Sequence, residues 1–325
     1  MTDVILSKAV EGFLLTKSAS GRSPNTIRNY KKELSRFIET TGDKEISAVT
    51  NQEIEKYLQY LRNDYRITSL ASTPIKPRKI TSKTLRNAWG TLSVFWKWVS
   101  NEFNIDNPFR ISPVRAFTKP INPLTQMEIE ALLKECDKYE KHFKDGKSYN
   151  SKRPTALRDK AIILTLVDSG MRVGELIGIK LGDIDFENGK ILITGKGNKQ
   201  RYVYLGKVSR QILWRYVTER YPKNTPPIDE PLFLHKDEIH GITGTGVRQV
   251  VKRIGEKASV PNVHPHRFRH TYAIQFLRNG GNIFELQHIL GHEDLAMVKN
   301  YVRLAQLDIE IASKKASPAD NWRLR

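Results

Sequence analysis

The chain has 325 residues, of which 39% are hydrophobic and 9% aromatic, so it is long enough for two ordinary domains that each bury a core. Its formal net charge is +19, and the basic excess is spread along the whole length, which excludes a single basic tail and favours nucleic acid over an anionic membrane as the partner. The single cysteine, Cys136, excludes an intramolecular disulfide framework and a cysteine-based zinc site; we expect an ordinary half-buried thiol.

Targeting signals are not evident. The N-terminal stretch MTDVILSKAVEGFLL lacks the basic segment and the cleavage site of a signal peptide, and no apolar run reaches the length of a membrane span. We therefore expect a protein that acts in the cytoplasm, with no membrane partner.

The first part of the chain is predicted to be helical. Ser23 can cap a helix that begins with Pro24, and an apolar stripe follows over residues 27–38. Thr50 and Glu53 form a capping box in front of a second amphipathic helix. These patterns indicate a small helical bundle.

A polar loop containing prolines is expected over residues 68–82, followed by another helix. That helix carries Trp89, Trp96 and Trp98 among apolar neighbours at helical spacing. Such spacing favours a role in the core over stacking on bases.

Three prolines among basic residues in FRISPVRAFTKPINP are typical of an extended linker. Thr125 and Glu128 then open a new helix with another capping box. We place a first domain at residues 1–118, the linker at 119–124 and a second domain at 125–325.

The second part is mixed. A helix is predicted over Thr155–Ser169, and the only strong strand signal lies in residues 182–206, where Asn188–Gly189 suits a tight hairpin turn. The chain from residue 209 onward reads as helical, with a loop near residues 223–231. The predicted fold class is mainly α, with a small antiparallel β-sheet in the C-terminal domain.

Five of the eight histidines lie between His264 and Tyr301. His266 and His270 have the spacing of a zinc-binding HExxH pair, but Arg267 stands where that motif has glutamate, so we expect no metal and no cofactor. Buried, satisfied side chains are the structural alternative. We assign five histidines to it: His142, His235, His240, His264 and His288.

An anion site explains the remaining pattern. Cleavage of a phosphodiester without metal needs guanidinium groups to hold the phosphate, a nucleophile and a general acid. A tyrosine phenol suits a reversible attack because its pKa, about 10, is lower than that of a serine hydroxyl. His266 and Arg269 are three residues apart and share a helix face.

The segments DSGMRVGELIGIKLGDID, HPHRFRHTYA and LGHEDLAMVKNY resemble the three signature boxes of the tyrosine recombinase (phage integrase) family, in the usual order and spacing. GKGNKQRYVYLG is similar to the family's β-hairpin with its lysine, and SPNTIRNYKKELSRFI is similar in pattern to its helical core-binding domain. The resemblance implies a two-domain DNA clamp, with a SAM-like core-binding domain followed by a catalytic domain.

The resemblance implies roles for individual residues. Arg172 and Arg269 would clamp the scissile phosphate, and Tyr301 would attack it to give a 3′-phosphotyrosine. Lys196 would protonate the leaving 5′-oxygen, with Lys199 as a rival.

The accessory roles are implied in the same way. His266 would assist proton transfer at the tyrosine or bond the phosphate, and His292 would bond a phosphate oxygen. Glu175 would orient the site, and His270 would serve in packing or behind the reacting groups.

The implied function is metal-free, site-specific recombination of double-stranded DNA with an inverted-repeat core site, within a homotetramer. The alternatives are a type IB topoisomerase and a non-catalytic DNA-binding regulator; a metal-dependent nuclease fits least. Residues 141–154 depart from the family pattern as a basic insertion. After the tyrosine, an amphipathic helix with Leu304, Leu307 and Ile311 is expected to end at Ser317–Pro318, docked on a neighbouring protomer or on its own domain.

Overall fold

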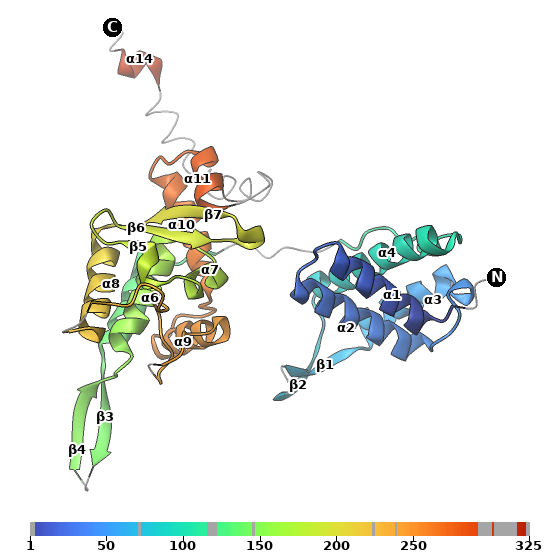
Figure 1. The fold of residues 1–325 in the computed structure, drawn as a ribbon, viewed down its shortest axis with the longest axis horizontal. Helices are drawn as coiled ribbons and strands as arrows, with labels where there is room; N and C mark the ends of the chain where they lie inside the picture. The colour runs from blue at the N-terminus through green and yellow to red at the C-terminus, as the bar shows by residue number, and fades with distance from the viewer. Residues whose placement is uncertain are drawn as a thin grey trace. The chain divides into compact units, whose positions relative to one another are not determined.

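The computed structural model describes residues 4–70, 73–115, 122–144, 147–222, 225–237, 239–291, 301 and 317–322. The chain divides into two compact units, Met1–Pro120 and Ile121–Arg325 (Figure 1). Each unit has its own hydrophobic core, so each is described by itself.

The first unit is a helical bundle, as expected. Its helices are α1 (Leu6–Ala19), α2 (Pro24–Thr41), α3 (Asn51–Asn63) and α4 (Ser82–Phe103), with a short 3₁₀ turn at Ile46–Ala48. The predicted caps form: the Ser23 side chain accepts from the Thr26 amide, and Thr50 and Glu53 bond each other reciprocally. The tryptophans of α4 pack in or against the core, and Trp96 is fully buried, which confirms their structural role.

The predicted loop between α3 and α4 contains a β-hairpin instead. Strands β1 (Arg66–Leu70) and β2 (Thr73–Lys79) pair antiparallel, with Ser69 opposite Pro74. Each strand of an isolated pair has an outer edge that needs no partner, so prolines are tolerated there. The prolines therefore argue only against a central strand.

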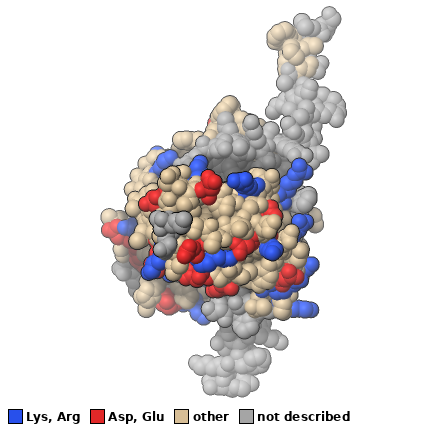
Figure 2. All heavy atoms as spheres, turned by 90° about the vertical axis from the view of Figure 1, so that its right-hand side faces the viewer, with Lys and Arg blue, Asp and Glu red and all other residues tan. Residues whose placement is uncertain are grey.

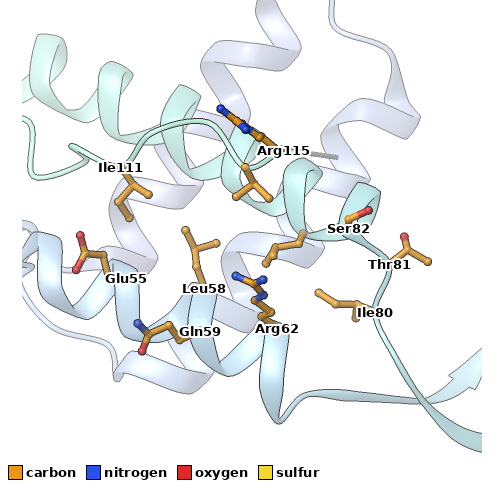
Figure 3. A pocket seen from close by; sticks show the side chains of 11 residues that line it. Glu55, Leu58, Gln59, Arg62, Ile80, Thr81, Ser82, Ile111 and Arg115 are labelled. Atoms are coloured by element: carbon orange, nitrogen blue, oxygen red, sulfur yellow. The ribbon is translucent and has the colours of Figure 1, made fainter. Parts of the chain in front are cut away.

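A cavity of about 640 Å³ lies in the first unit between α3, the start of α4 and the segment that follows α4 (Figure 3). Leu58, Leu85 and Ile111 supply apolar walls, and Arg62 and Arg115 bring guanidinium groups to it. The face seen in Figure 2 carries basic and acidic side chains interspersed among its described residues, with no patch of a single sign.

The second unit is built around α6 (Ala156–Ser169), the helix predicted at 155–169. Most of its residues are buried, and it contacts α5 (Gln126–Asp137), α8 (Lys207–Arg220), α9 (Gly244–Lys257) and α10 (Pro265–Arg278). The capping box of Thr125 and Glu128 at the start of α5 is confirmed. Cys136 in α5 is completely buried rather than half-buried, and burial raises the pKa of its thiol to about 12.

A three-stranded antiparallel sheet accompanies these helices, in the order β5 (Ile184–Asp185), β6 (Lys190–Thr194) and β7 (Gln200–Tyr204). Asp185 pairs with Lys190, so residues 186–189 form the turn between β5 and β6, wider than a two-residue hairpin turn. Gly189 has φ +66°, which explains the glycine in the predicted turn. The predicted class, mainly α with a small antiparallel sheet, is confirmed.

Two connecting segments of this unit have structure that the sequence pattern did not indicate. The basic insertion forms a second hairpin, β3 (Tyr139–Lys144) and β4 (Lys147–Lys152), which projects between α5 and α6 (Figure 1). Its polar sequence lacks the alternation of a half-buried strand, because it pairs only with itself. The second is the loop expected near residues 223–231, which is longer than predicted: α8 ends at Arg220, and helix resumes only at Gly244.

The remaining helices of this unit are α7 (Val173–Ile177) and α11 (Ile283–Leu290), with a short α14 (Pro318–Asn321) near the C-terminus. Pro318 is the first residue of α14, and the helix expected to end at Ser317–Pro318 lies outside the described residues. Leu304, Leu307 and Ile311 lie outside the described residues. Over the described ranges of both units, none of the helices has the length and apolar character needed to cross a membrane.

Candidate active site

Arg172 stands at the junction of α6 and α7. Gly170 ends α6 with φ +61°, and a Cβ there would lie 2.5 Å from the Tyr272 ring, so only glycine fits. Arg172 then caps α7: its amide donates to Glu175 Oε2 at 2.7 Å, and its Nη1 donates to Glu175 Oε1 at 3.1 Å. The carboxylate therefore fixes both the backbone and the guanidinium of Arg172.

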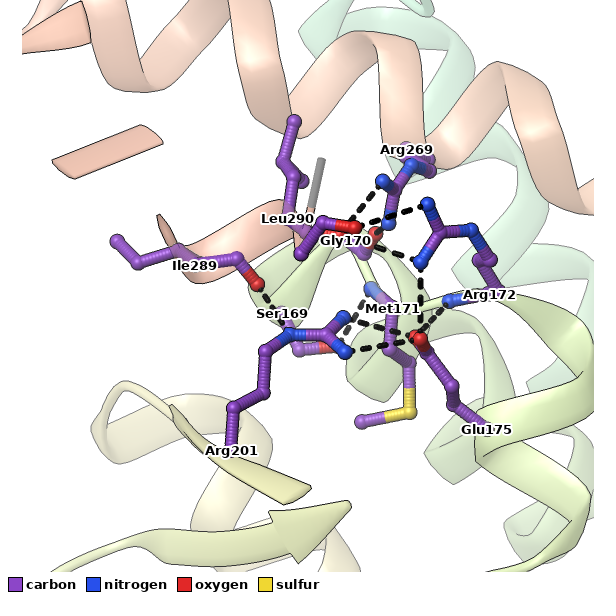
Figure 4. A network of polar contacts seen from close by, with 10 residues as sticks. Ser169, Gly170, Met171, Arg172, Glu175, Arg201, Arg269, Ile289 and Leu290 are labelled. Carbon is purple, nitrogen blue, oxygen red and sulfur yellow. Dashed lines mark hydrogen bonds and ion pairs between the residues drawn. The ribbon is translucent and has the colours of Figure 1, made fainter. Parts of the chain in front are cut away.

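Arg269 approaches the same point from α10 and is 3% exposed. Its Nη1 donates to the Gly170 carbonyl at 2.9 Å and its Nη2 to the Leu290 carbonyl at 2.8 Å. Arg172 Nη1 donates to that same Leu290 carbonyl at 3.3 Å (Figure 4). The two guanidinium groups are therefore held side by side on one oxygen atom.

The shared acceptor belongs to the C-terminal end of α11. Arg172 Nη2 also donates to the next carbonyl, that of Gly291, at 3.3 Å. Carbonyls at a helix C-terminus lack partners within the helix and carry partial negative charge. That charge offsets the repulsion between the two cations and presents them as a pair.

The electrostatics of this cluster favour an anion. Burial, with the nearby Arg172, lowers the pKa of Arg269 to about 10. Burial alone would raise the pKa of Glu175, but hydrogen bonds from Arg201 and Arg172 outweigh it and lower that pKa. The cluster thus contains three guanidinium groups and one ionised carboxylate, which Arg172 and Arg201 contact, so positive charge is in excess.

Tyr301 lies against the same group of helices and is 4% exposed, packed with Ile274, Leu286 and Leu290. Its hydroxyl lies 2.8 Å from Nδ1 of His270, with ring centroids 5.5 Å apart. Burial raises the pKa of the Tyr301 phenol, while the charges of Arg269 and Arg172 act to lower it. The phenol is therefore within the electrostatic reach of both arginines.

His270 is the hydrogen-bond partner of this phenol. Burial, with the neighbouring His266, lowers the pKa of His270 to about 4. The imidazole is consequently neutral at pH 7, and a neutral ring has one nitrogen free to accept a proton. The resemblance implied only packing or support for His270, yet this ring makes the direct contact with Tyr301.

His266 and Lys196 are predicted site residues that the structure describes in whole or in part. His266 lies on α10 with part of its ring exposed, and partial burial, with the charges of Arg269, His264 and Arg172, lowers its pKa. The backbone of Lys196 begins the 3₁₀ turn Lys196–Asn198 between β6 and β7; its side chain and His292 lie outside the described parts of the chain. Lys199 is exposed at the end of the same turn.

Of the five histidines expected to be buried, four are exposed (His235, His240, His264 and His288), so that expectation was wrong for them; the side chain of His142 lies outside the described parts of the chain. His235 and His240 face Asp237 at 3.4 and 3.3 Å, and His264 precedes the first residue of α10. In the parts of the chain that the structure describes, there is no group of three His, Cys, Asp or Glu side chains arranged to hold a metal ion.

Arg201 was missed by sequence reasoning. Its Nη1 and Nη2 donate to the two oxygens of Glu175, each at 2.9 Å, and its Nε donates to the Ile289 carbonyl at 2.7 Å (Figure 4). Along β7, Arg201 and Val203 turn inward while their neighbours are exposed. The two-residue alternation of the strand was the signal that could have found it.

Comparison with known proteins decides the family. Residues 122–307, more than half of the chain, match the phage integrase family. The chain belongs to the phage integrase family. Residues 10–103 of this recombinase also match the N-terminal SAM-like domain of phage integrases.

Curated relatives agree over nearly the full length. The recombinase is 29% identical to the tyrosine recombinase XerC of Oceanobacillus iheyensis, over 98% of this chain and 97% of the relative. It is 30% identical to the XerC of Halalkalibacterium halodurans, over 91% and 93% of the two chains. The protein is thus a tyrosine-type site-specific recombinase, and this prediction is confirmed.

Solved structures share the fold. The XerH site-specific recombinase bound to a palindromic difH substrate matches with a TM-score of 0.69 and 21% identity, over 95% of this recombinase and 84% of that chain. The Tn1549 transposon integrase in complex with transposon right end DNA matches with a TM-score of 0.71 and 18% identity, over 97% and 100%.

Proposed function

We propose that this recombinase cuts and rejoins DNA strands through a 3′-phosphotyrosine intermediate, without a metal ion. The observation that carries the mechanism is the buried Tyr301 hydroxyl on His270, within the electrostatic reach of the Arg172–Arg269 pair. In the cutting step, the Tyr301 oxygen attacks the scissile phosphorus and the bond to the 5′-oxygen breaks. Rejoining is the reverse attack by a 5′-hydroxyl.

The arginine pair supplies the electrostatic stabilisation. Negative charge grows on the non-bridging oxygens during the attack, and guanidinium groups already in place stabilise that charge without reorganising. Arg269 and Arg172 are held on the Leu290 carbonyl before any DNA arrives, so the cost of bringing two cations together is met by the fold.

Two proton transfers accompany the attack. The phenol proton passes to the neutral ring of His270, which is in hydrogen-bond contact with the Tyr301 hydroxyl. Lys196, on the turn between β6 and β7, donates a proton to the leaving 5′-oxygen, with Lys199 as the neighbouring alternative. His266 and His292 bond the phosphate oxygens.

The two domains have different roles on the DNA. Residues 1–118 form the core-binding domain, residues 119–124 the linker, and residues 125–325 the catalytic domain, which together hold double-stranded DNA. The palindromic substrate to which the XerH recombinase is bound supports an inverted-repeat core site. Exchange of strands between two duplexes needs four cuts and four nucleophiles, which supports a homotetramer. Action on DNA supports a location on the nucleoid in the cytoplasm.

The test uses a duplex carrying the target site with a nick close to the scissile phosphate, so that cleavage traps the covalent complex. The unaltered protein should form this complex in excess EDTA, since Arg172 and Arg269 provide the positive charge. Tyr301→Phe removes only the hydroxyl and should bind the duplex normally without forming a complex. A covalent product with Tyr301→Phe, or a requirement for added magnesium, would overturn the mechanism.

A further inference from the structure

Arg201 is the third guanidinium of the cluster, and it points inward from the sheet. Its side chain is 8% exposed, and its partner Glu175 is 4% exposed. Burial of a charged pair is tolerated when geometry is good and further hydrogen bonds satisfy both groups. Both conditions hold: the fork of Arg201 meets both carboxylate oxygens, and its Nε reaches the Ile289 carbonyl (Figure 4).

The partners of Arg201 belong to two other segments of the site. Glu175 fixes Arg172 through its backbone amide and its guanidinium. Ile289 directly precedes Leu290, whose carbonyl holds Arg172 and Arg269, and Gly291, after which His292 follows in the sequence. One side chain on β7 therefore connects the sheet to α7 and to the end of α11.

The strand that carries Arg201 also forms the base of the lysine turn. Arg201 pairs with Ile193 and Gln200 with Thr194, and the Gly195 amide donates to the Lys199 carbonyl at 2.8 Å. These backbone bonds form the turn that begins at Lys196. They do not attach it to the arginine pair, which lies on other segments.

Two glycines fit closely around this guanidinium. A Cβ on Gly291 would lie 3.0 Å from Arg201 Nη1, and a Cβ on Gly195 would lie 3.4 Å from the same atom and 3.3 Å from Glu175 Oε1. Gly195 directly precedes Lys196, and Gly291 directly precedes His292. The chain thus approaches Arg201 closely just before each of these two residues.

We propose that Arg201 is a positioning residue: it anchors the β6–β7 turn to Glu175 and to the end of α11, so that Lys196 is aligned with the leaving oxygen of the phosphate held by Arg172 and Arg269. This inference rests on the proposed function. Arg201 acts through Glu175 and the Ile289 carbonyl, toward which its fork and its Nε are directed, and does not itself touch the reacting atoms.

The role can be separated from simple support of the fold by changing the leaving group. In a nicked duplex with sulfur in place of the bridging 5′-oxygen, attack by Tyr301 breaks the P–S bond and releases a thiolate. A thiol has a pKa of ~8.5, far below that of an alcohol, so the thiolate leaves without receiving a proton. Only the proton-donation step becomes dispensable; the attack and the phosphate clamp are still needed.

The variant is Arg201→Lys, which keeps the charge but loses the planar fork. We expect covalent-complex formation on the oxygen substrate to slow by about 10²-fold, the effect of misplacing a catalytic group by about 1 Å. On the sulfur substrate its rate should remain close to that of the unaltered protein. Lys196→Ala should show the same selective rescue.

Arg210→Lys is the matched control, because Arg210 also bonds a backbone carbonyl at this sheet, that of Glu187 at 2.6 Å, but at the end away from the lysine turn. The Arg210→Lys variant should form the covalent complex at the rate of the unaltered protein on both substrates. Binding of the nicked duplex, measured by gel shift, should be unchanged for all variants and shows that they are folded.

Three results would overturn the inference. Equal slowing of Arg201→Lys on both substrates would assign Arg201 to the phosphate clamp or to the fold, and no slowing on the oxygen substrate would remove its role. If the sulfur substrate does not restore the rate of Lys196→Ala, Lys196 is not the proton donor that Arg201 would align. By contrast, an unaltered protein that forms no covalent complex on either substrate would refute the proposed function itself.

Discussion

Arg267 and Arg269 are two residues apart in one motif, and the structure predicts opposite consequences for their removal. Arg267 is buried at the start of α10 and donates to three carbonyls, those of Asn122, Pro123 and Pro261, and to both oxygens of Glu128 at 2.8 and 3.0 Å. It therefore fixes the first described residues of the second unit to α5 and α10. We expect Arg267→Met to destabilise this unit without entering the chemistry.

The magnitude follows from burial. The side chain of Arg267 is 8% exposed and that of Glu128 is 23% exposed, so the variant leaves a carboxylate and three carbonyls without their donor. Breaking a buried pair from one side costs about 3–5 kcal/mol of unfolding free energy. At about 2–4 °C per kcal/mol for a unit of this size, its melting temperature should fall by roughly 6–20 °C.

Differential scanning calorimetry of the full chain measures this, with the transition of the first unit as an internal reference. Arg253→Met is the matched control: Arg253 also pairs with a buried carboxylate, Asp159, but its side chain is 48% exposed, so we expect a loss of at most about 1 kcal/mol. If Arg267→Met shifts neither transition by more than Arg253→Met does, the assignment of Arg267 as an anchor is wrong. The reasoning also fails if Arg267→Met, assayed well below its melting temperature, forms covalent complex as slowly as Arg269→Met.

Three further predictions concern the chemistry and the assembly. His270→Phe should slow covalent-complex formation by about 10²-fold. Since the pKa of His270 lies at about 4, the contribution of this ring should be fully present at neutral pH and lost only as the pH falls through about 4. A pH–rate profile of the unaltered protein that breaks near 6.5 instead would count against this role. Arg269→Ala should lower the rate of strand cutting far more than the affinity for DNA. Arg115→Ala should instead weaken DNA binding and reduce the slope of log binding constant against log salt concentration by ~0.9 for each phosphate interaction that is removed. Equal losses of affinity for the two variants in gel shifts would contradict a catalytic role for Arg269. Truncation after Arg303 should leave binding to a half-site intact and prevent tetramer assembly on a full site in native gels; full recombination by the truncated chain would show that the tail is not the connector.

Much of the fold could be predicted from the sequence because the signals that mark its helices are local. Capping boxes such as Thr50–Glu53 and Thr125–Glu128 satisfy helix ends within four residues, so they mark helix starts in any tertiary context. The two unexpected hairpins lack such signals, because the strands of each hairpin pair with one another and no capping residue marks where they begin.

The site could be predicted only as far as the resemblance carried the residues. His270 and Tyr301 are 31 residues apart and meet through tertiary packing, so no pattern along the chain indicated which histidine faces the phenol. Arg201 was hidden for a similar reason: its partners, Glu175 and Ile289, lie 26 residues before it and 88 after it. Motif order identifies which groups take part, but contacts between distant segments decide what each one does.

The burial of Arg269 bears on how the enzyme responds to its medium. Dissolved ions screen charges that face solvent and act only weakly on charges enclosed by protein, and Arg269 is enclosed. The many exposed lysines and arginines that attract the DNA backbone belong to the first kind. Ionic strength should therefore set how much of the enzyme is occupied by DNA, while the rate of strand cutting within an occupied complex stays nearly the same.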